Sequence, residues 1–137
     1  MPAFFGLMFM NIAILVLLVC CVLPILCSWI SGYYRHKQLG VVDNKIPRLQ
    51  NAQLTGVGAR AVAAQHNAWE ALAVYSAALL ALNMAAVPVE KYTQLCLIFM
   101  IMRIMHAIFY MLNWDALRSI AYLVGYGICV YFLVLSL

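Results

Sequence analysis

Four long apolar stretches constrain the fold of this chain more than any other feature of its sequence. Each has about the 20 residues that a membrane-spanning helix requires, and within a bilayer the backbone must be helical because no water satisfies its polar groups. Hydrophobic residues make up 68% of the 137-residue chain and charged residues 9%, whereas soluble domains have about 25% charged residues. The sequence therefore predicts an all-α integral membrane four-helix bundle, a single domain over residues 1–137 with helices at roughly 4–30, 57–86, 89–112 and 116–137.

The connections between these stretches predict the orientation of the chain in the membrane. Residues 31–55 form the longest expected loop, and Asp43 is its single acidic residue. The same loop carries four basic residues: Arg35, Lys37, Lys45 and Arg48. Lysine and arginine collect in the cytoplasmic loops of membrane proteins. We therefore expect a multi-pass protein with this loop in the cytoplasm and both termini on the non-cytoplasmic side.

Charge and cysteine usage exclude several other functions. The formal net charge is +4, but no basic run or basic stripe interleaved with aromatic residues is present, so a nucleic-acid partner is not expected. The cysteines have neither CxxC spacing nor a Cys/His ligand pattern, so no metal site is expected. Each is interpreted as a small buried hydrophobic side chain; the five are Cys20, Cys21, Cys27, Cys96 and Cys129.

The second and third apolar stretches contain polar residues, and on each predicted helix these residues lie on one side. On the second helix, Asn67 lies about 20° around the axis from Arg60, and Glu70 lies about 80° from Arg60. The third helix carries a polar stripe about 60° wide. This stripe is formed by Arg103, His106 and Tyr110. In the first stretch, Asn11 is expected to hydrogen-bond to another helix.

The depths of these residues predict that Glu70 faces Arg103. At 1.5 Å per residue, Glu70 lies about 15 Å deeper in the membrane than Arg60 on the second helix. On the antiparallel third helix, Arg103 lies about 10 Å deeper than Tyr110. A buried glutamate–arginine pair either fixes the register of two helices or takes part in binding a ligand, and the sequence leaves both interpretations open.

The remaining polar groups are expected to line one cleft that faces the cytoplasm. Asn67 is predicted to lie near His106 or Tyr110. Arg60 and Arg118 are predicted to stand at the rim of this cleft. Arginines combined with several hydrogen-bond donors suit a small anionic ligand that carries carboxylates.

Three segments together carry a resemblance to a known family. The segments RAVAAQHNAWE (60–70), RIMHAIFY (103–110) and LRS (117–119) resemble the MAPEG family, the membrane-associated proteins in eicosanoid and glutathione metabolism. The small bacterial members are the most similar, and the resemblance extends over essentially the whole chain. It implies a homotrimer in a bacterial inner membrane, with glutathione as co-substrate bound between neighbouring subunits near the cytoplasmic face.

The resemblance also implies roles for individual residues. Arg118, together with Ser119, is the catalytic candidate, because the equivalent arginine is the usual candidate for stabilising the glutathione thiolate. The candidate glutathione-binding residues are Arg60, Asn67, Glu70, Arg103, His106 and Tyr110. The chain departs from the eukaryotic enzymes at Ala63 and His66, where those enzymes have more arginine.

Two functions follow from these observations. The first is a glutathione S-transferase-like membrane enzyme, a transferase or peroxidase that acts on lipophilic electrophiles reaching it from the lipid. The alternative is a non-catalytic MAPEG-like protein that binds lipid or serves as an accessory subunit of a larger membrane complex. Conjugation, peroxide reduction and isomerisation all begin from the same thiolate, so the sequence does not separate them.

Overall fold

The chain folds into helices throughout the part that is described. The computed structural model describes residues 2–137, with side chains from Ile12 onward, so the hydrogen bond expected of Asn11 lies outside the described residues. The elements are α1 (Pro2–Leu39), α2 (Pro47–Asn51), α3 (Gly56–Met84), the 3-10 helix η1 (Val89–Lys91), α4 (Thr93–Leu112) and α5 (Asp115–Leu135). Residues 2–137 contain no strand, which confirms the predicted all-α class.

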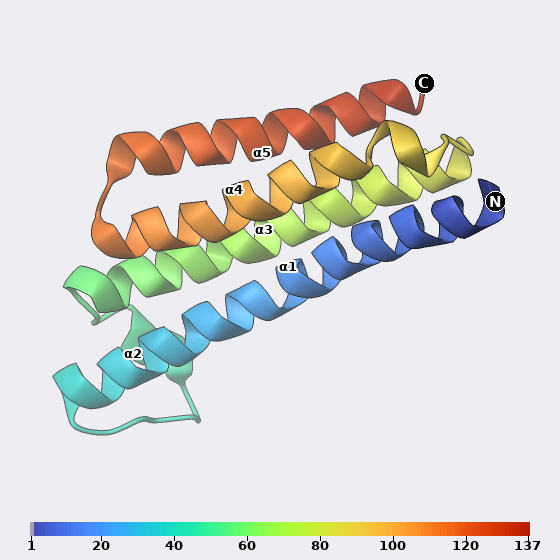
Figure 1. Ribbon diagram of the computed structural model, residues 1–137. Coiled ribbons are helices and arrows are strands. Elements are labelled where there is room, and N and C mark those ends of the chain that lie inside the picture. Colours follow the sequence, from blue (N-terminus) through green and yellow to red (C-terminus); the bar gives the residue numbers. More distant parts are fainter. Residues whose placement is uncertain (1) are drawn as a thin grey trace.

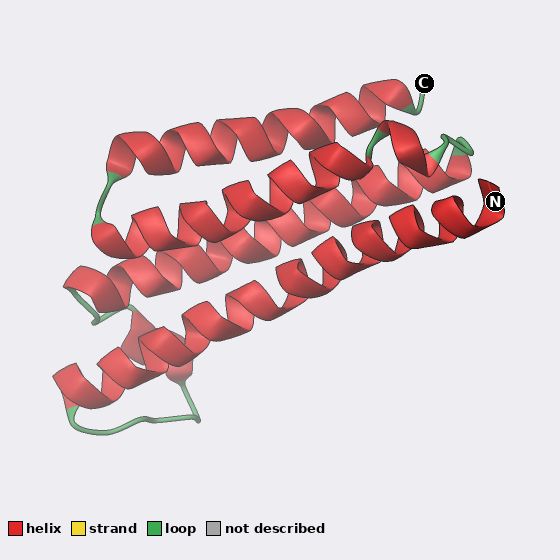
Figure 2. Cartoon of the chain, viewed as in Figure 1, coloured by secondary structure: helices red, strands yellow, loops and turns green. Residues whose placement is uncertain are grey.

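The long helices α1, α3, α4 and α5 lie side by side, and each runs opposite to the long helix before it (Figure 1). Helix α1 packs against α3 and α4, and α5 packs against the same two helices. The connections lie at the two ends of the bundle (Figure 2), and both chain termini lie at the same end. Helices α3 and α4 therefore form the middle of the bundle, with α1 and α5 on its flanks.

Aromatic rings and small residues fill the centre of the bundle. Tyr75 of α3 stacks on Phe99 of α4 with ring centroids 4.6 Å apart. The Tyr75 hydroxyl donates a hydrogen bond to the carbonyl oxygen of Ala13 in α1, at 3.3 Å. Buried alanines on α3 let the neighbouring helices approach closely; they are Ala61, Ala64, Ala68 and Ala78.

The cysteines follow the expected burial with one exception. Four are buried, namely Cys20, Cys27, Cys96 and Cys129. Cys21 is exposed, so the prediction of burial was wrong for this residue. Adjacent residues of a helix point about 100° apart, and the face of α1 that carries Cys20 is the one that packs into the core.

Three helices in the described part are long and apolar enough to cross a membrane, namely the described portion of α1 from Ile12, α4 and α5. Helix α3 has 29 residues, which is ample length at about 1.5 Å per residue. Its polar residues lower its hydropathy, however, and it is not among the three. That α3 is a fourth membrane-spanning helix stays a prediction.

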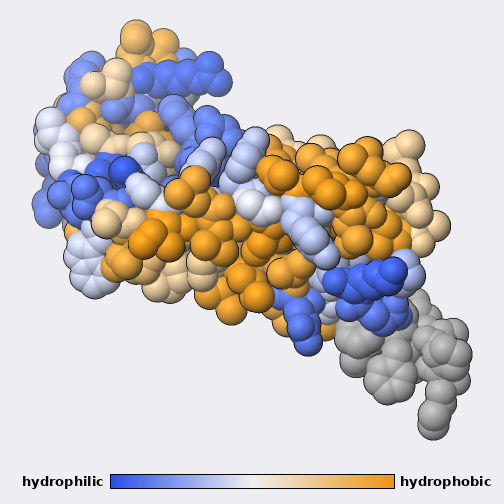
Figure 3. All heavy atoms as spheres, turned by 90° about the horizontal axis from the view of Figure 1, so that it is seen from above, coloured by the Kyte–Doolittle hydropathy of each residue, from blue (hydrophilic) through white to orange (hydrophobic). Residues whose placement is uncertain are grey.

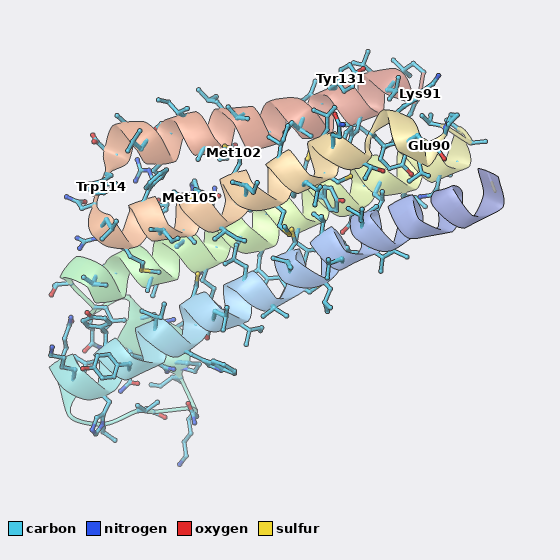
Figure 4. All side chains as sticks on the ribbon, viewed as in Figure 1. Glu90, Lys91, Met102, Met105, Trp114 and Tyr131 are labelled. Atoms are coloured by element: carbon cyan, nitrogen blue, oxygen red, sulfur yellow. The ribbon has the colours of Figure 1, made fainter. Side chains whose placement is uncertain are left out.

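The surface of the bundle has an apolar middle and polar ends. In Figure 3 the hydrophobic side chains cover the middle of the visible face, and hydrophilic side chains gather at the end that holds α2. Trp114, in the turn between α4 and α5, lies at this end, whereas Glu90 and Lys91 lie at the opposite end (Figure 4). This distribution is the one expected when lipid surrounds the middle and water wets both ends.

Helix α1 is longer than predicted. The expected boundary was near Ile30, but the helix continues to Leu39 and ends at Gly40, whose φ is +77°. The Gly40 amide donates to the carbonyl oxygen of His36 at 3.0 Å. Hydropathy marks where a helix leaves the bilayer, whereas hydrogen bonding and glycine decide where it ends, so the two boundaries differ.

Two glutamines organise the connection between α1 and α3. The Gln38 side chain accepts a hydrogen bond from the Thr55 amide at 3.0 Å and donates one to the Thr55 carbonyl oxygen at 3.1 Å. The buried Gln50 side chain accepts from the Asp43 amide at 2.8 Å and donates to the Val41 carbonyl oxygen at 3.0 Å. The Gln38 bonds link the end of α1 to the start of α3, and the Gln50 bonds link α2 to the segment before it, where the sequence predicted only a loop.

Candidate functional site

A cleft of about 330 Å³ lies among α3, α4 and α5 near the end of the bundle that carries α2. Its size is at the lower end of the usual range for small-molecule sites. Five of the eight predicted site residues line it, and they are Asn67, His106, Tyr110, Arg118 and Ser119. The remaining lining residues are Tyr122 and Leu123. We call this the Arg118 cleft.

Arg118 is held over an aromatic ring at the wall of the Arg118 cleft. Its guanidinium carbon lies 4.6 Å from the centroid of the Tyr110 ring, and the Tyr110 ring meets the edge of His106 at 5.3 Å between centroids. A guanidinium in this position gains a cation–π attraction and keeps its N–H groups for another partner. Arg118 is half-buried, so a ligand in the cleft can reach its positive charge.

Ser119 also lies in the Arg118 cleft, but its hydroxyl is already engaged. The Ser119 hydroxyl donates to the carbonyl oxygen of Asp115, one turn earlier in α5, at 2.9 Å. Serine commonly makes this bond inside a helix. The Ser119 oxygen can still accept a hydrogen bond, whereas donation to a ligand requires the hydroxyl to rotate away from Asp115.

Arg103 lies behind the Arg118 cleft as a buried cation. Its side chain is 3% exposed. One terminal nitrogen, Nη2, donates to the Asn67 side-chain oxygen and lies 3.5 Å from both the Asn67 carbonyl oxygen and His106 Nδ1. Its Nε has no hydrogen-bond partner. Because Asn67 and His106 line the Arg118 cleft, Arg103 acts on that cleft by positioning these two residues.

Glu70 is not the partner of Arg103, contrary to the sequence prediction. Both residues line a smaller cavity of about 50 Å³ beside the Arg118 cleft. Glu70 is exposed, and within residues 12–137 the Arg103 side chain is hydrogen-bonded to the amide of Asn67 and not to a carboxylate. A neutral amide satisfies a buried guanidinium without the cost of also taking a carboxylate out of water, which explains this choice of partner.

Arg60 lies outside both cavities. Its Nε donates to the carbonyl oxygen of Met111, in the last turn of α4, at 3.3 Å. The last carbonyl oxygens of a helix lack partners within the helix, and a basic side chain near them is favourable. Arg60 therefore stabilises the end of α4, and the structure does not bring it together with the other predicted site residues.

His66 points away from the Arg118 cleft. It is exposed and lines a third cavity, together with residues of α2. His66 and Asn67 are neighbours in sequence and therefore point about 100° apart on α3.

Tyr122 is a site residue that sequence reasoning missed. It lines both the Arg118 cleft and the smaller cavity beside it. Its ring centroid lies 6.3 Å from that of His106 and 6.0 Å from that of Tyr126. The available signal was its spacing, because residue 122 follows Arg118 by four positions and so lies on the same face of α5.

Arg35 was missed for a different reason. It is 8% exposed, and its Nε and Nη1 atoms have no hydrogen-bond partner. The sequence placed Arg35 in a solvated loop, whereas the continuation of α1 turns it toward the interior. Only the observed end of α1 reveals this buried cation.

The cleft suits an anionic ligand better than a metal ion. Within residues 12–137, no group of three or more His, Cys, Asp or Glu side chains is arranged to hold a metal ion. The Arg118 guanidinium, the Tyr110 hydroxyl and the His106 ring instead provide hydrogen-bond donors around one volume. Donors of this kind bind carboxylates and stabilise thiolates.

The comparison with known proteins identifies the family of the chain. The model of the MAPEG family matches residues 12–137, nearly the whole chain, and confirms the resemblance identified in the sequence. No curated protein and no solved structure matches the chain. The family consists of membrane helical bundles, so the three apolar helices belong to an integral membrane protein. This chain is a member of the MAPEG family.

Proposed function

We propose that this chain is a glutathione-dependent membrane transferase or peroxidase that acts on lipophilic electrophiles as a homotrimer. The MAPEG family includes glutathione-dependent transferases as well as other members. The observation that carries the proposal is the Arg118 cleft, where a reachable guanidinium lies beside an imidazole, a phenol and an amide. The homotrimer rests on the resemblance to the family.

The proposed role of Arg118 is to stabilise the glutathione thiolate. A free thiol has a pKa of about 8.5 and is mostly protonated at neutral pH. A guanidinium beside the sulfur lowers this pKa and increases the fraction of the nucleophilic thiolate. In conjugation, the sulfur lone pair forms the new carbon–sulfur bond, and the electron pair of the broken bond leaves with the departing group.

The other residues are proposed to hold the body of glutathione. His106, Tyr110 and Asn67 offer hydrogen bonds from the cleft wall. Arg103 keeps Asn67 and His106 in place and contributes a positive potential from behind the cleft. Glu70 is the acceptor available for an amino group of the ligand, since it is exposed beside the cleft.

Titration of glutathione into the purified protein tests the proposal through the ultraviolet absorbance of the bound thiolate. An adjacent cation shifts a pKa by about 1–3 units, so we expect Arg118→Ala to reduce the bound thiolate at pH 7 roughly tenfold or more. Arg118→Lys should retain part of the signal. Arg48→Ala is the matched control, because Arg48 lies at the same end of the bundle in a different cavity. No thiolate signal in the unaltered protein, or an undiminished signal in Arg118→Ala, contradicts the proposal.

The second candidate is a non-catalytic lipid-binding protein or an accessory subunit. Two observations favour it: the Ser119 hydroxyl is bonded to Asp115, and His66, which stands where eukaryotic members have arginine, points away from the Arg118 cleft. Native mass spectrometry of gently extracted protein separates the two functions. Three chains with bound glutathione support the enzyme, whereas a stoichiometric partner protein with an empty cleft supports the accessory subunit.

A further inference from the structure

The connection between α1 and α3 presents apolar and basic side chains together on its surface. An open hollow of about 270 Å³ is lined there by consecutive residues, namely Lys45, Ile46, Pro47, Arg48 and Leu49. Ile46 is 52% exposed and Leu49 is 60% exposed. Lys45 and Arg48 are exposed as well. Two large apolar side chains and two cations are therefore available to one partner, and we call residues 45–49 the α2 segment.

The α2 segment lies beside the bundle, because the chain folds back after the end of α1. Figure 1 shows the connection turning back along α1 toward the middle of the bundle. Arg48 lines one cavity together with Val62 and His66 of α3. Val62 lies about 9 Å along α3 from its first residue, Gly56. The α2 segment is therefore nearer to the middle of the bundle than the start of α3 is.

The exposed aromatic residues of α1 mark the same level. Gly58 of α3 faces Tyr34 of α1. Because the two helices run in opposite directions, Val62, about 6 Å further along α3, lies level with the turn of α1 between Trp29 and Tyr33. Trp29 is 69% exposed and Tyr33 is 60% exposed. Exposed tryptophan and tyrosine are typical of the headgroup layer of a bilayer, which places the α2 segment at the level of the lipid headgroups.

The charges of the α2 segment indicate the sign of its partner. Lys45 and Arg48 are both positive, and the one acidic residue of the connection, Asp43, is half-buried. The Asp43 carboxylate accepts a hydrogen bond from the Lys45 amide at 2.7 Å. Lysine and arginine beside a bilayer attract anionic headgroups, and arginine can bind a phosphate through two N–H groups.

We propose that the α2 segment docks on the anionic phospholipids of the adjacent leaflet. Ile46 and Leu49 enter the boundary between headgroups and acyl chains, which removes their apolar surface from water. Lys45 and Arg48 bind the phosphate groups around them. None of these residues lines the Arg118 cleft, so the docking is independent of the glutathione chemistry proposed there.

Spin labels in reconstituted vesicles that contain phosphatidylglycerol measure the depth of the α2 segment. In a chain whose cysteines are replaced by alanine, a label at Leu49→Cys should meet oxygen dissolved in the lipid more often than a water-soluble nickel complex. A label at His36→Cys should show the reverse. His36 is exposed and lies about 4.5 Å beyond Tyr33, toward the end of α1. Leu49 is thus expected to lie deeper than His36, although it follows His36 in the connection.

Two results of the depth measurement overturn the proposal. Equal access of the nickel complex to the labels at residues 36 and 49 shows that Leu49 lies in water. A label at residue 49 that neither oxygen nor nickel reaches, and that is broadened by a second label, shows that another copy of the chain covers the α2 segment.

Competition between two lipids tests the charges in a chain that keeps its native cysteines. The chain is released from nanodiscs of phosphatidylglycerol and phosphatidylcholine, and the retained lipids are identified by native mass spectrometry. We expect phosphatidylglycerol to be preferred, and Lys45→Gln and Arg48→Gln should each reduce this preference roughly fivefold. Lys91→Gln is the matched control, because it removes the same charge beside Glu90 at the opposite end of the bundle. It should leave the preference unchanged.

The lipid competition also has results that overturn the proposal. Equal retention of the two lipids by the unaltered chain shows that the α2 segment does not select anionic headgroups. A preference that survives both Lys45→Gln and Arg48→Gln belongs to other residues. The thiolate titration of Arg118→Ala tests the proposed enzyme separately and does not depend on any of these results.

Discussion

Asn67 is the residue on which the buried charge of Arg103 depends. A guanidinium with only 3% of its surface exposed loses nearly all contact with water, so its hydrogen bonds to protein atoms must replace that hydration. Asn67 supplies its side-chain oxygen to Arg103 Nη2, and its backbone oxygen lies 3.5 Å from the same nitrogen. The buried guanidinium therefore relies on a neutral amide and not on the exposed carboxylate of Glu70.

Replacing Asn67 should destabilise the protein more than replacing another asparagine of α3. Asn67→Leu leaves a buried charged donor without its partner, which costs about 1–3 kcal/mol. Arg103→Met in the same chain should recover much of this loss, because removing both partners costs less than removing one. Thermal unfolding in detergent measures the effect.

Asn83→Leu provides the matched control for this experiment. Asn83 is exposed and donates to the Leu79 carbonyl oxygen within α3, so its replacement should change stability by less than about 0.5 kcal/mol. If Asn67→Leu is no more destabilising than Asn83→Leu, the Asn67–Arg103 bond contributes nothing measurable.

At the scale of elements, α1 and α3 pack against each other beside the connection that carries α2. The two helices are in close contact at Gly58, where a side-chain Cβ would lie 2.9 Å from the Cβ of Tyr34. A Cβ atom moves only with its backbone, so this contact cannot be relieved by a change of rotamer. Glycine at residue 58 is therefore a requirement of the crossing, and the bonds between Gln38 and Thr55 lie next to it.

Gly58→Ala should separate α1 from α3 and destabilise the bundle by about 1–3 kcal/mol, the usual cost of overpacking. Gly127→Ala in α5 is the control, because a Cβ at residue 127 meets nothing within 4 Å. Alanine favours a helix interior over glycine by about 0.5–1 kcal/mol, so Gly127→Ala should be neutral or stabilising. If the unfolding temperature falls equally in Gly58→Ala and Gly127→Ala, a Cβ at residue 58 does not clash with Tyr34.

For the whole molecule, the alternating direction of the four long helices puts both termini at one end and the basic connection with α2 at the other (Figure 1). Arg35, Lys37 and Arg48 lie in this connection or beside it, whereas Glu90 and Lys91 balance each other at the opposite end. The positive-inside rule predicts that the α2 end is cytoplasmic.

Cysteine labelling in intact cells tests this orientation. In a chain whose native cysteines are replaced by alanine, we expect Lys91→Cys to react with a membrane-impermeant maleimide added outside. Lys45→Cys should react only after the membrane is permeabilised. The reverse pattern contradicts the predicted orientation, and labelling of both positions before permeabilisation shows that the membrane is not intact.

The class of the protein and much of its candidate site could be predicted from the amino-acid sequence. Hydropathy marks the apolar helices, because lipid accepts only apolar side chains and closed backbone hydrogen bonds. Helix geometry gives each residue a face and a depth, which is why Asn67, His106 and Tyr110 were expected together and do line one cleft. These properties are local and follow from fixed rotation and rise per residue.

The partners of individual side chains required the tertiary structure. Arg103 donates a hydrogen bond to Asn67 and not to Glu70. Arg60 donates to the Met111 carbonyl oxygen at the end of α4. Ser119 donates to the Asp115 carbonyl oxygen within α5. Arg103 and Glu70 line the same small cavity, so which residue pairs with Arg103 depends on how the helices pack and on the cost of desolvating each group. The sequence determines which polar groups reach a given depth of the bundle, whereas only the packed structure decides which of them meet.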